Sequence, residues 1–193
     1  MPAQKVLLIR HGETEWSLNG RHTGTTDIPL TEHGRDVARR WKPVLSQRTF
    51  ALVLTSPLRR ARETCELTGL GQRAEVDNDL HEWNYGDYEG ITAEQILAQR
   101  PSWMIFRDGC PGGESPKEIQ ARIDRVIKKV RAVEGEVALF SHGHFLRSFG
   151  ARWLGLPAED GVFFLLDPAT VSVVSFYRST PAVKCWNAPL IHY

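Results

Sequence analysis

The chain has 193 residues, which suits one domain, and we expect residues 1–193 to fold as a single unit. Hydrophobic residues make up 41% and charged residues 24%, enough apolar material for one core and a composition that argues against disorder. The formal net charge is +1, so no overall basic field exists to collect nucleic acid or an acidic membrane. An anion, if bound, must be bound by a local cluster of basic side chains.

Three cysteines, Cys65, Cys110 and Cys185, are far apart and odd in number. This pattern predicts reduced thiols rather than a disulfide framework or a structural zinc site. The first residues do not resemble a signal peptide, because charge returns after a short apolar run at residues 6–9, and no stretch approaches the length of a membrane span. We therefore expect a cytoplasmic protein with no nucleic-acid or membrane partner.

Strands and helices are expected to alternate along the chain. In chain order, the pattern predicts a buried strand (5–10), a polar loop (11–29), a helix (31–45), a strand (51–55), a helix (56–69), a short strand (75–77), a loop (79–90), a short helix from Thr92, an irregular segment (101–113), a long helix (115–133), a strand (137–140), a helix (144–154) and a late strand (171–177). Pro43 should end or kink the first helix. Capping boxes are expected at Thr92 with Gln95 and at Ser115 with Glu118.

This alternation predicts an α/β fold, specifically a three-layer α/β/α sandwich with a mostly parallel central sheet. In such sheets the functional site lies at the carboxyl ends of the strands. Residues 10–11 (RH), 56–60 (SPLRR) and 141–144 (SHGH) follow three of the expected strands. We therefore expect histidine and arginine side chains to meet at one edge of the sheet.

These residue types suit the transfer of a phosphoryl group. Arginine binds phosphoryl oxygens through a rigid fork, and helix N-termini add backbone N–H donors. A neutral imidazole is a competent nucleophile at phosphorus, and a carboxyl group can protonate the leaving oxygen. The sequence offers all three groups, so no cofactor or metal is implied.

Four stretches, in this order, resemble the histidine phosphatase superfamily, which includes phosphoglycerate mutases and acid phosphatases. They are residues 10–14 (RHGET), 55–61 (TSPLRRA), 82–86 (EWNYG) and 141–144 (SHGH). The resemblance is weakest after about residue 156. It implies a phosphoglycerate mutase-like fold and a phosphatase (phosphoric monoester hydrolase) that uses a histidine nucleophile.

The resemblance also implies roles for individual residues. His11 is the nucleophile, Glu82 is the general acid and base, and Arg10, Arg60 and a charged His142 surround the phosphoryl oxygens. Arg60 is preferred to its neighbour Arg59 because the family pattern places the arginine directly before alanine. The remaining positions implied to line the substrate pocket are Ser17, Thr23, Gly24, Tyr85 and Gly143.

Residues 82–90 and 103–110 resemble a narrower branch of the superfamily. That branch includes acid phosphatases and sugar-bisphosphate phosphatases related to sedoheptulose bisphosphatase, so small phosphorylated metabolites are the implied substrates. Arg107 is a candidate to bind a second anionic group of the substrate. An ion pair between Arg107 and Asp108 is an equally good interpretation.

Other functions stay open at this point. A phosphoglycerate mutase is disfavoured because only about fifty residues separate Gly90 from Ser141, without an adjacent arginine pair, and because Ser17 replaces the asparagine typical of those mutases. A catalytically silent binding module is disfavoured because the catalytic set is complete, and a protein-phosphohistidine phosphatase because the aromatic residues near Glu82 suggest a walled pocket. His142 and His144 could form a metal pair, although no local carboxylate or cysteine supports it. Both a monomer and a homodimer remain open.

Overall fold

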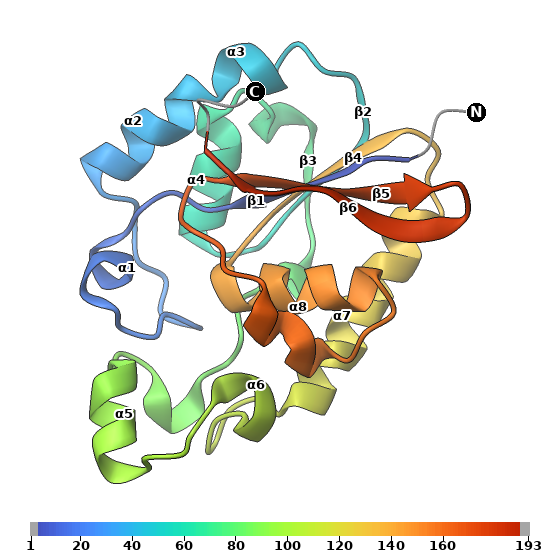
Figure 1. Cartoon of the computed structure of the whole chain (residues 1–193). Helices are drawn as coiled ribbons and strands as arrows, with labels where there is room; N and C mark the ends of the chain where they lie inside the picture. The colour runs from blue at the N-terminus through green and yellow to red at the C-terminus, as the bar shows by residue number, and fades with distance from the viewer. Residues whose placement is uncertain (1–3, 190–193) are drawn as a thin grey trace.

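A six-stranded sheet runs through the centre of the computed structural model, which describes residues 4–189 (Figure 1). The strands are β1 (Val6–Arg10), β2 (Phe50–Thr55), β3 (Ala74–Val76), β4 (Glu136–Ser141), β5 (Val171–Tyr177) and β6 (Thr180–Ala188). The α-helices are α1 (Glu15–Asn19), α2 (Glu32–Arg40), α3 (Lys42–Leu45), α4 (Arg59–Leu67), α5 (Ala93–Gln99), α6 (Ile105–Asp108), α7 (Pro116–Arg131) and α8 (Gly143–Trp153). Short 3-10 helices are η1 (Gly71–Arg73), η2 (Asn78–Leu80), η3 (Gly86–Tyr88) and η4 (Ala158–Phe163).

The strand order is β3-β2-β4-β1-β5-β6. The pairs β1–β4, β2–β4 and β2–β3 are parallel, whereas β5 pairs with β1 and β6 in antiparallel fashion. The expected α/β fold with a mostly parallel sheet is confirmed. β1 and β4 are adjacent near the middle of the sheet, so their carboxyl ends lie side by side.

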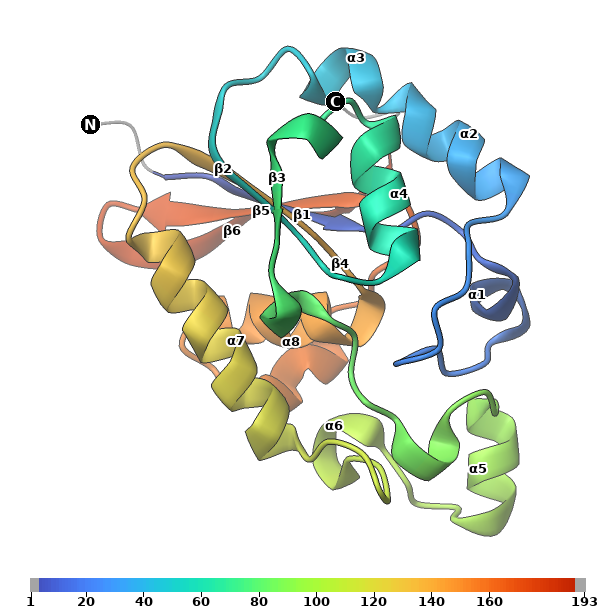
Figure 2. The ribbon, with the colours of Figure 1, turned by 180° about the vertical axis from the view of Figure 1, so that it is seen from behind.

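Helices cover both faces of the sheet, as Figures 1 and 2 show from opposite sides. Helices α2, α3 and α4 lie on one face, and α7 and α8 lie on the other. β1 explains how one strand serves both layers: Leu7 and Ile9 belong to one buried apolar cluster, whereas Val6 and Leu8 belong to the other. Alternate side chains of a strand point to opposite faces, so a continuous apolar run suits a strand covered on both sides.

Local sequence signals set several helix ends. The Thr31 hydroxyl accepts a hydrogen bond from Gly34 N and caps α2, and the helix is interrupted before Pro43, which lies in the first turn of α3. Both expected capping boxes are present, at Thr92 for α5 and at Ser115 for α7. These capping interactions are each typically worth about 1 kcal/mol of helix stability.

Several expectations need correction. Short helices α1 and α6 lie in segments expected to be a loop and irregular, respectively. Helix α4 begins at Arg59, later than expected, and the Arg59 N–H donates to the Asp27 carboxylate at 2.6 Å. The Ser56 hydroxyl accepts instead from Leu58 N and from His142 Nε2. The second strand of the C-terminal hairpin, β6, was not expected, since Pro181 and its mixed polar sequence argue against a central strand. As an edge strand, β6 tolerates a residue that has no N–H to donate.

Within residues 4–189, none of the helices combines the length and the apolar character needed to span a bilayer.

Candidate active site

The carboxyl ends of β1 and β4 bring two histidines together. Arg10 is aligned with Ser141 in the parallel register, so the next residues, His11 and His142, are neighbours with ring centroids 5.2 Å apart. Just after His11 the backbone passes close to the start of α2. A Cβ atom on Gly12 would lie 2.7 Å from the carbonyl oxygen of Gly34, so only glycine fits there.

The ring of His11 is held in one orientation. Its Nδ1 lies 2.7 Å from the Gly12 carbonyl oxygen, to which it can only donate, so Nε2 keeps its lone pair. Burial, followed by the nearby charges of Arg60 and Arg10, lowers the pKa of His11 well below its ordinary value. His11 is therefore neutral, as a nucleophile must be.

His142 differs from the sequence-based expectation in its charge. Arg60 Nε donates to His142 Nδ1 at 3.2 Å, so the ring proton is on Nε2, which donates to the Ser56 hydroxyl. Burial first, and the Arg60 charge second, lower the pKa of His142 well below its ordinary value. The expected imidazolium is therefore wrong for this structure, and His142 is a neutral ring.

Two arginines supply the positive charge around His11. Arg60 is completely buried and donates to the carbonyl oxygens of Thr23, Gly24 and Thr26. Arg10 donates to the carbonyl oxygen of Leu166, while its buried Nε has no hydrogen-bond partner among the described residues. A buried donor without a partner is costly, so the guanidinium of Arg10 is arranged for an acceptor that binds beside His11.

The side chain of Glu82 lies against the N-terminus of helix α8. Its carboxylate accepts hydrogen bonds from the backbone N–H groups of Trp83, His144 and Phe145, at 2.9, 3.1 and 2.9 Å. The side chain is 5% exposed and lines the same cavity as His11. These donors fix the carboxyl group where it can reach a substrate atom in the cavity.

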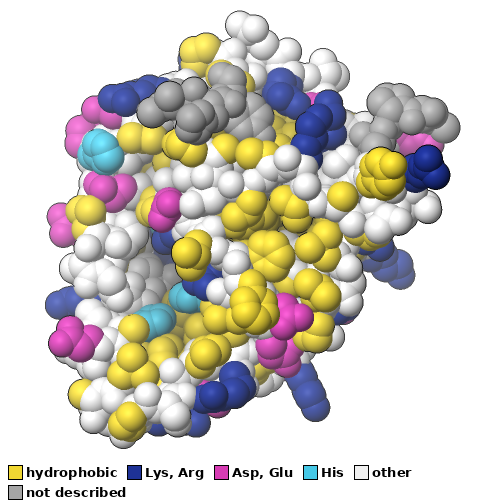
Figure 3. Space-filling model, in the orientation of Figure 1, with side chains coloured by type: hydrophobic (Ala, Val, Ile, Leu, Met, Phe, Trp, Pro, Cys, Tyr) yellow, Lys and Arg dark blue, Asp and Glu magenta, His cyan; other side chains and the backbone are white. Residues whose placement is uncertain are grey.

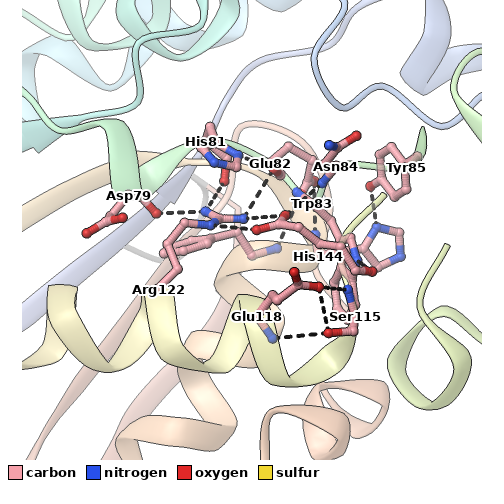
Figure 4. A network of polar contacts seen from close by, with 12 residues as sticks. Asp79, His81, Glu82, Trp83, Asn84, Tyr85, Ser115, Glu118, Arg122 and His144 are labelled. Atoms are coloured by element: carbon pink, nitrogen blue, oxygen red, sulfur yellow. Dashed lines mark hydrogen bonds and ion pairs between the residues drawn. The ribbon is translucent and has the colours of Figure 1, made fainter. Parts of the chain in front are cut away.

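The segment that contains Glu82 is anchored from helix α7 by Arg122 (Figure 4). Arg122 donates to the carbonyl oxygens of Asp79, His81 and Glu82 and forms a two-bond ion pair with the carboxylate of Glu114. Arg122 is 4% exposed. Its buried guanidinium, with all its N–H groups hydrogen-bonded, connects helix α7 to the loop that contains Glu82.

These side chains surround a cavity of about 180 Å³, a size suited to a small molecule. Figure 3 shows histidine and basic side chains together on this face, between α1 and the region of α5 and α6. The cavity is lined by Arg10, His11, Thr14, Trp16, Ser17, Gly20, Arg21, His22, Thr23, Glu82, Tyr85, Gly143, His144, Arg147 and Leu166.

Most site residues expected from the sequence meet here. Arg10, His11, Ser17, Thr23, Glu82, Tyr85 and Gly143 line the cavity. Arg60 and His142 do not line it: the His142 ring packs against the His11 ring, and Arg60 donates to His142 Nδ1. Gly24 belongs to the supporting structure: its N–H binds the Glu89 carboxylate, and a Cβ there would lie 2.6 Å from the carbonyl oxygen of Trp83.

Arg107 is not brought to the cavity. Its exposed guanidinium pairs with the Asp108 carboxylate at 2.8 Å and donates to the carbonyl oxygen of Ser102. The ion pair considered from the sequence is therefore what the structure contains, and Arg107 does not line the pocket.

Other cavity residues were missed from the sequence. Burial lowers the pKa of His22, and its ring packs edge-on against that of Tyr85 with ring centroids 4.8 Å apart. Arg147 lies one helical turn after Gly143 on α8, a spacing that could have identified it. The carbonyl group of Leu166 had no sequence signal, because any residue supplies one.

The two histidines considered as a metal pair point to different partners. His142 contacts Arg60 and Ser56, whereas His144 Nδ1 contacts the Tyr85 hydroxyl at 2.6 Å. Within residues 4–189, no group of three or more histidine, cysteine or acidic side chains is placed to hold a metal ion.

Comparison with known proteins places this chain in a family. The sequence profile described as "Histidine phosphatase superfamily (branch 1)" matches residues 6–189. The chain is 39% identical over 176 residues to an acid phosphatase of Mycobacterium tuberculosis (strain ATCC 25618 / H37Rv), covering 89% of this chain and 86% of the relative. It is 38% identical over 187 residues to a sedoheptulose 1,7-bisphosphatase of Saccharomyces cerevisiae (strain ATCC 204508 / S288c), covering 80% and 69%.

Solved structures agree. The structure of a protein encoded by an open reading frame of Mycobacterium tuberculosis superposes with a TM-score of 0.89 at 35% identity, covering 96% of this chain and 98% of that one. The phosphoglycerate mutase-like arrangement expected from the sequence is thereby confirmed. The family match spans almost the whole described chain, and the relatives resemble it along most of their own length. The chain therefore belongs to branch 1 of the histidine phosphatase superfamily.

Proposed function

We propose that the chain is a metal-independent phosphomonoesterase that hydrolyses small phosphorylated metabolites through a phosphohistidine at His11. In the first step, His11 Nε2 bonds to phosphorus, and the bond between phosphorus and the ester oxygen breaks. Glu82 gives its proton to that oxygen, and the alcohol leaves. Arg10 and Arg60 stabilise the charge on the phosphoryl oxygens during transfer.

The second step returns the enzyme to its starting state. Glu82, now a carboxylate, takes a proton from a water molecule whose oxygen bonds to phosphorus. The bond between phosphorus and His11 Nε2 breaks, and phosphate leaves. One carboxyl group thus acts first as acid and then as base, which is consistent with its fixed position beside His11.

The single observation that carries this proposal is the state of His11. It is neutral, its Nδ1 is held by the Gly12 carbonyl group, and it lies beside a buried arginine donor that lacks a partner. A neutral nucleophile, His11, next to an arginine that can bind an anion, Arg10, favours chemistry on a phosphoryl group over simple binding.

The cavity wall supports sugar phosphates or bisphosphates as substrates. Besides Arg10, the arginines Arg21 and Arg147 line the cavity. Arg147 Nε and Nη2 donate to the carbonyl oxygens of Gly161 and Val162, and its guanidinium lies 4.6 Å above the Phe106 ring. This leaves a fixed positive charge for a second oxygen-rich group, the role first considered for Arg107. The name of the yeast relative, a bisphosphatase, points the same way.

The test is phosphate release by purified protein in the presence of a chelator, with 4-nitrophenyl phosphate, sugar bisphosphates and 3-phosphoglycerate as substrates. We expect release that resists the chelator and falls roughly a thousandfold or more in His11→Ala. His33→Ala, at an exposed histidine outside the cavity lining, is the matched control and should retain activity. Release unaffected by His11→Ala would contradict the mechanism.

The same assay separates the alternatives. A mutase would convert 3-phosphoglycerate to its isomer without net release of phosphate, and that result would replace the proposed hydrolysis. No turnover of any phosphomonoester, together with retained binding of phosphate, would favour a catalytically silent binding module.

A further inference from the structure

Tyr85, which is buried, and His144, which is partly buried, form a pair on the wall of the cavity. The Tyr85 hydroxyl lies 2.6 Å from His144 Nδ1, and both residues line the cavity beside Glu82 (Figure 4). The proposed mechanism uses neither side chain. The His144 ring is further enclosed by the rings of His22, Trp83 and Phe106, so it has little freedom to turn.

The Tyr85 hydroxyl and His144 Nδ1 lie within hydrogen-bonding distance, and a neutral imidazole nitrogen can either donate or accept. Burial, and then the charge of Glu82, raise the pKa of Tyr85 well above its ordinary value, so the phenol keeps a proton to donate. Donation from Tyr85 to Nδ1 places the proton of a neutral His144 on Nε2.

The ring stays neutral in this arrangement. Burial, followed by the charge of Arg147, lowers the pKa of His144 well below its ordinary value. A neutral ring that accepts at Nδ1 has one remaining polar group, the Nε2–H donor. No hydrogen bond from this nitrogen to a described residue is present, although the ring lines the cavity.

The place of His144 identifies what this donor would meet. Its backbone N–H binds the Glu82 carboxylate at 3.1 Å, so the residue lies beside the group proposed to protonate the ester oxygen. A hydroxyl oxygen on a carbon next to the ester-bearing carbon would come within reach of this wall. A leaving group without such an oxygen would offer the donor nothing.

We propose that His144, held by Tyr85 as the Nε2–H tautomer, is a specificity-determining residue that donates a hydrogen bond to a hydroxyl group adjacent to the phosphate ester. The preferred substrates are then phosphomonoesters of polyhydroxylated compounds rather than of simple alcohols. This inference rests on the proposed phosphatase function and adds to it the recognition of the leaving group.

Two substrates with the same branched skeleton test the inference. Glycerol 2-phosphate has hydroxyl groups on both carbons next to the ester-bearing carbon, and isopropyl phosphate has none. In His144→Leu, we expect the ratio of kcat/KM for glycerol 2-phosphate to kcat/KM for isopropyl phosphate to fall roughly tenfold relative to the wild type. His144→Gln, which retains an N–H donor, should keep the ratio within about threefold of the wild type.

Tyr85→Phe removes the hydroxyl that sets the tautomer and should lower the ratio in the same direction. Tyr177→Phe and His33→Leu change exposed residues of the same types and should leave both rates unchanged. Equal losses on the two substrates in His144→Leu, or an unchanged ratio, would overturn the inference.

An NMR measurement tests the tautomer independently of activity. In protein labelled with ¹⁵N at histidine, long-range proton–nitrogen correlations should show His144 protonated at Nε2, with the signal altered in Tyr85→Phe. Protonation at Nδ1 would overturn the inference. Hydrolysis that persists in His11→Ala would instead contradict the proposed function, so the two failures are distinguishable.

Discussion

Glu82 is held by three backbone N–H groups, two of them from the first turn of α8. If it protonates the leaving oxygen, its removal should matter most when that oxygen is a poor leaving group. We expect Glu82→Gln to lower kcat by about 10²–10⁴-fold for an alkyl phosphate and by much less for 4-nitrophenyl phosphate. The measurement is kcat for both substrates, and equal losses on the two would show that Glu82 is not the acid.

His11 leads to a prediction about the acid side of the pH profile. An ordinary histidine, with a pKa of about 6.5, would lose about nine-tenths of its neutral form at pH 5.5. Burial and the neighbouring arginines lower the pKa of His11, so it should remain a nucleophile through this range. We expect kcat/KM, corrected for the ionisation of the substrate, to show no decline centred near pH 6.5.

At the scale of single residues, the sequence predicted which side chains come together at the site, but not their protonation states. The strand-end argument placed His11, Arg60 and His142 at one edge of the sheet, whereas Glu82 was assigned by the family resemblance. The neutral state of His142 depends on the Arg60 Nε contact, and the position of Arg107 depends on its ion pair with Asp108. Such contacts depend on side-chain rotamers and burial, which the spacing of residues along the sequence does not reveal.

At the scale of elements, helix α7 acts on the site through Arg122. Replacing this buried arginine by methionine would remove five hydrogen bonds, two to the Glu114 carboxylate and three to carbonyl groups. The carbonyl oxygens of Asp79 and His81 would lose the donor that Arg122 supplies. We expect a loss of roughly 3–5 kcal/mol in the free energy of unfolding, measured with denaturant. Since the Glu82 segment loses its anchor, kcat should also fall in the fraction that remains folded.

Arg125 provides the matched control on the same helix. It makes two hydrogen bonds to the Asp79 carboxylate, but its side chain is 60% exposed. Exposed ion pairs contribute little to stability, so Arg125→Met should barely change unfolding or activity. Similar effects of the two substitutions would mean that burial does not distinguish these arginines.

Elements with strong local signals were predicted well, and those defined by tertiary contacts were not. The capping boxes at Thr92 and Ser115 mark helix starts by chemistry that is complete within four residues. β6 becomes a strand only because β5 pairs with it, and α4 begins late, at Arg59, whose N–H donates to the distant Asp27 carboxylate. Neither contact is local in the sequence.

For the whole molecule, the buried histidines make stability depend on pH. Burial lowers the pKa of His22 and, more strongly, the pKa values of His11, His142 and His144, which dominate the effect. The unfolded chain takes up protons on these residues below about pH 6.5, whereas the folded chain does not, so stability falls as the pH falls through this range. We expect the free energy of unfolding to drop by up to about 4 kcal/mol between pH 7.5 and 5.5.

Denaturant titrations at the two pH values measure this drop. His144→Gln removes one of the three most strongly shifted groups and should reduce the drop by up to a third. A free energy of unfolding that is constant between pH 7.5 and 5.5 would contradict the neutral, buried state of these rings.

The position of β1 in the sheet has a consequence for synthesis. β1 pairs with β4 and β5, and its partner in β4 lies about 130 residues further along the chain. At roughly 5–20 residues per second, a ribosome would expose the apolar β1 for roughly 7–26 seconds before either neighbour exists. During that interval the nascent chain presents an unpaired hydrophobic strand near its start, a natural binding target for a chaperone, and the catalytic pocket can form only after β4 has emerged.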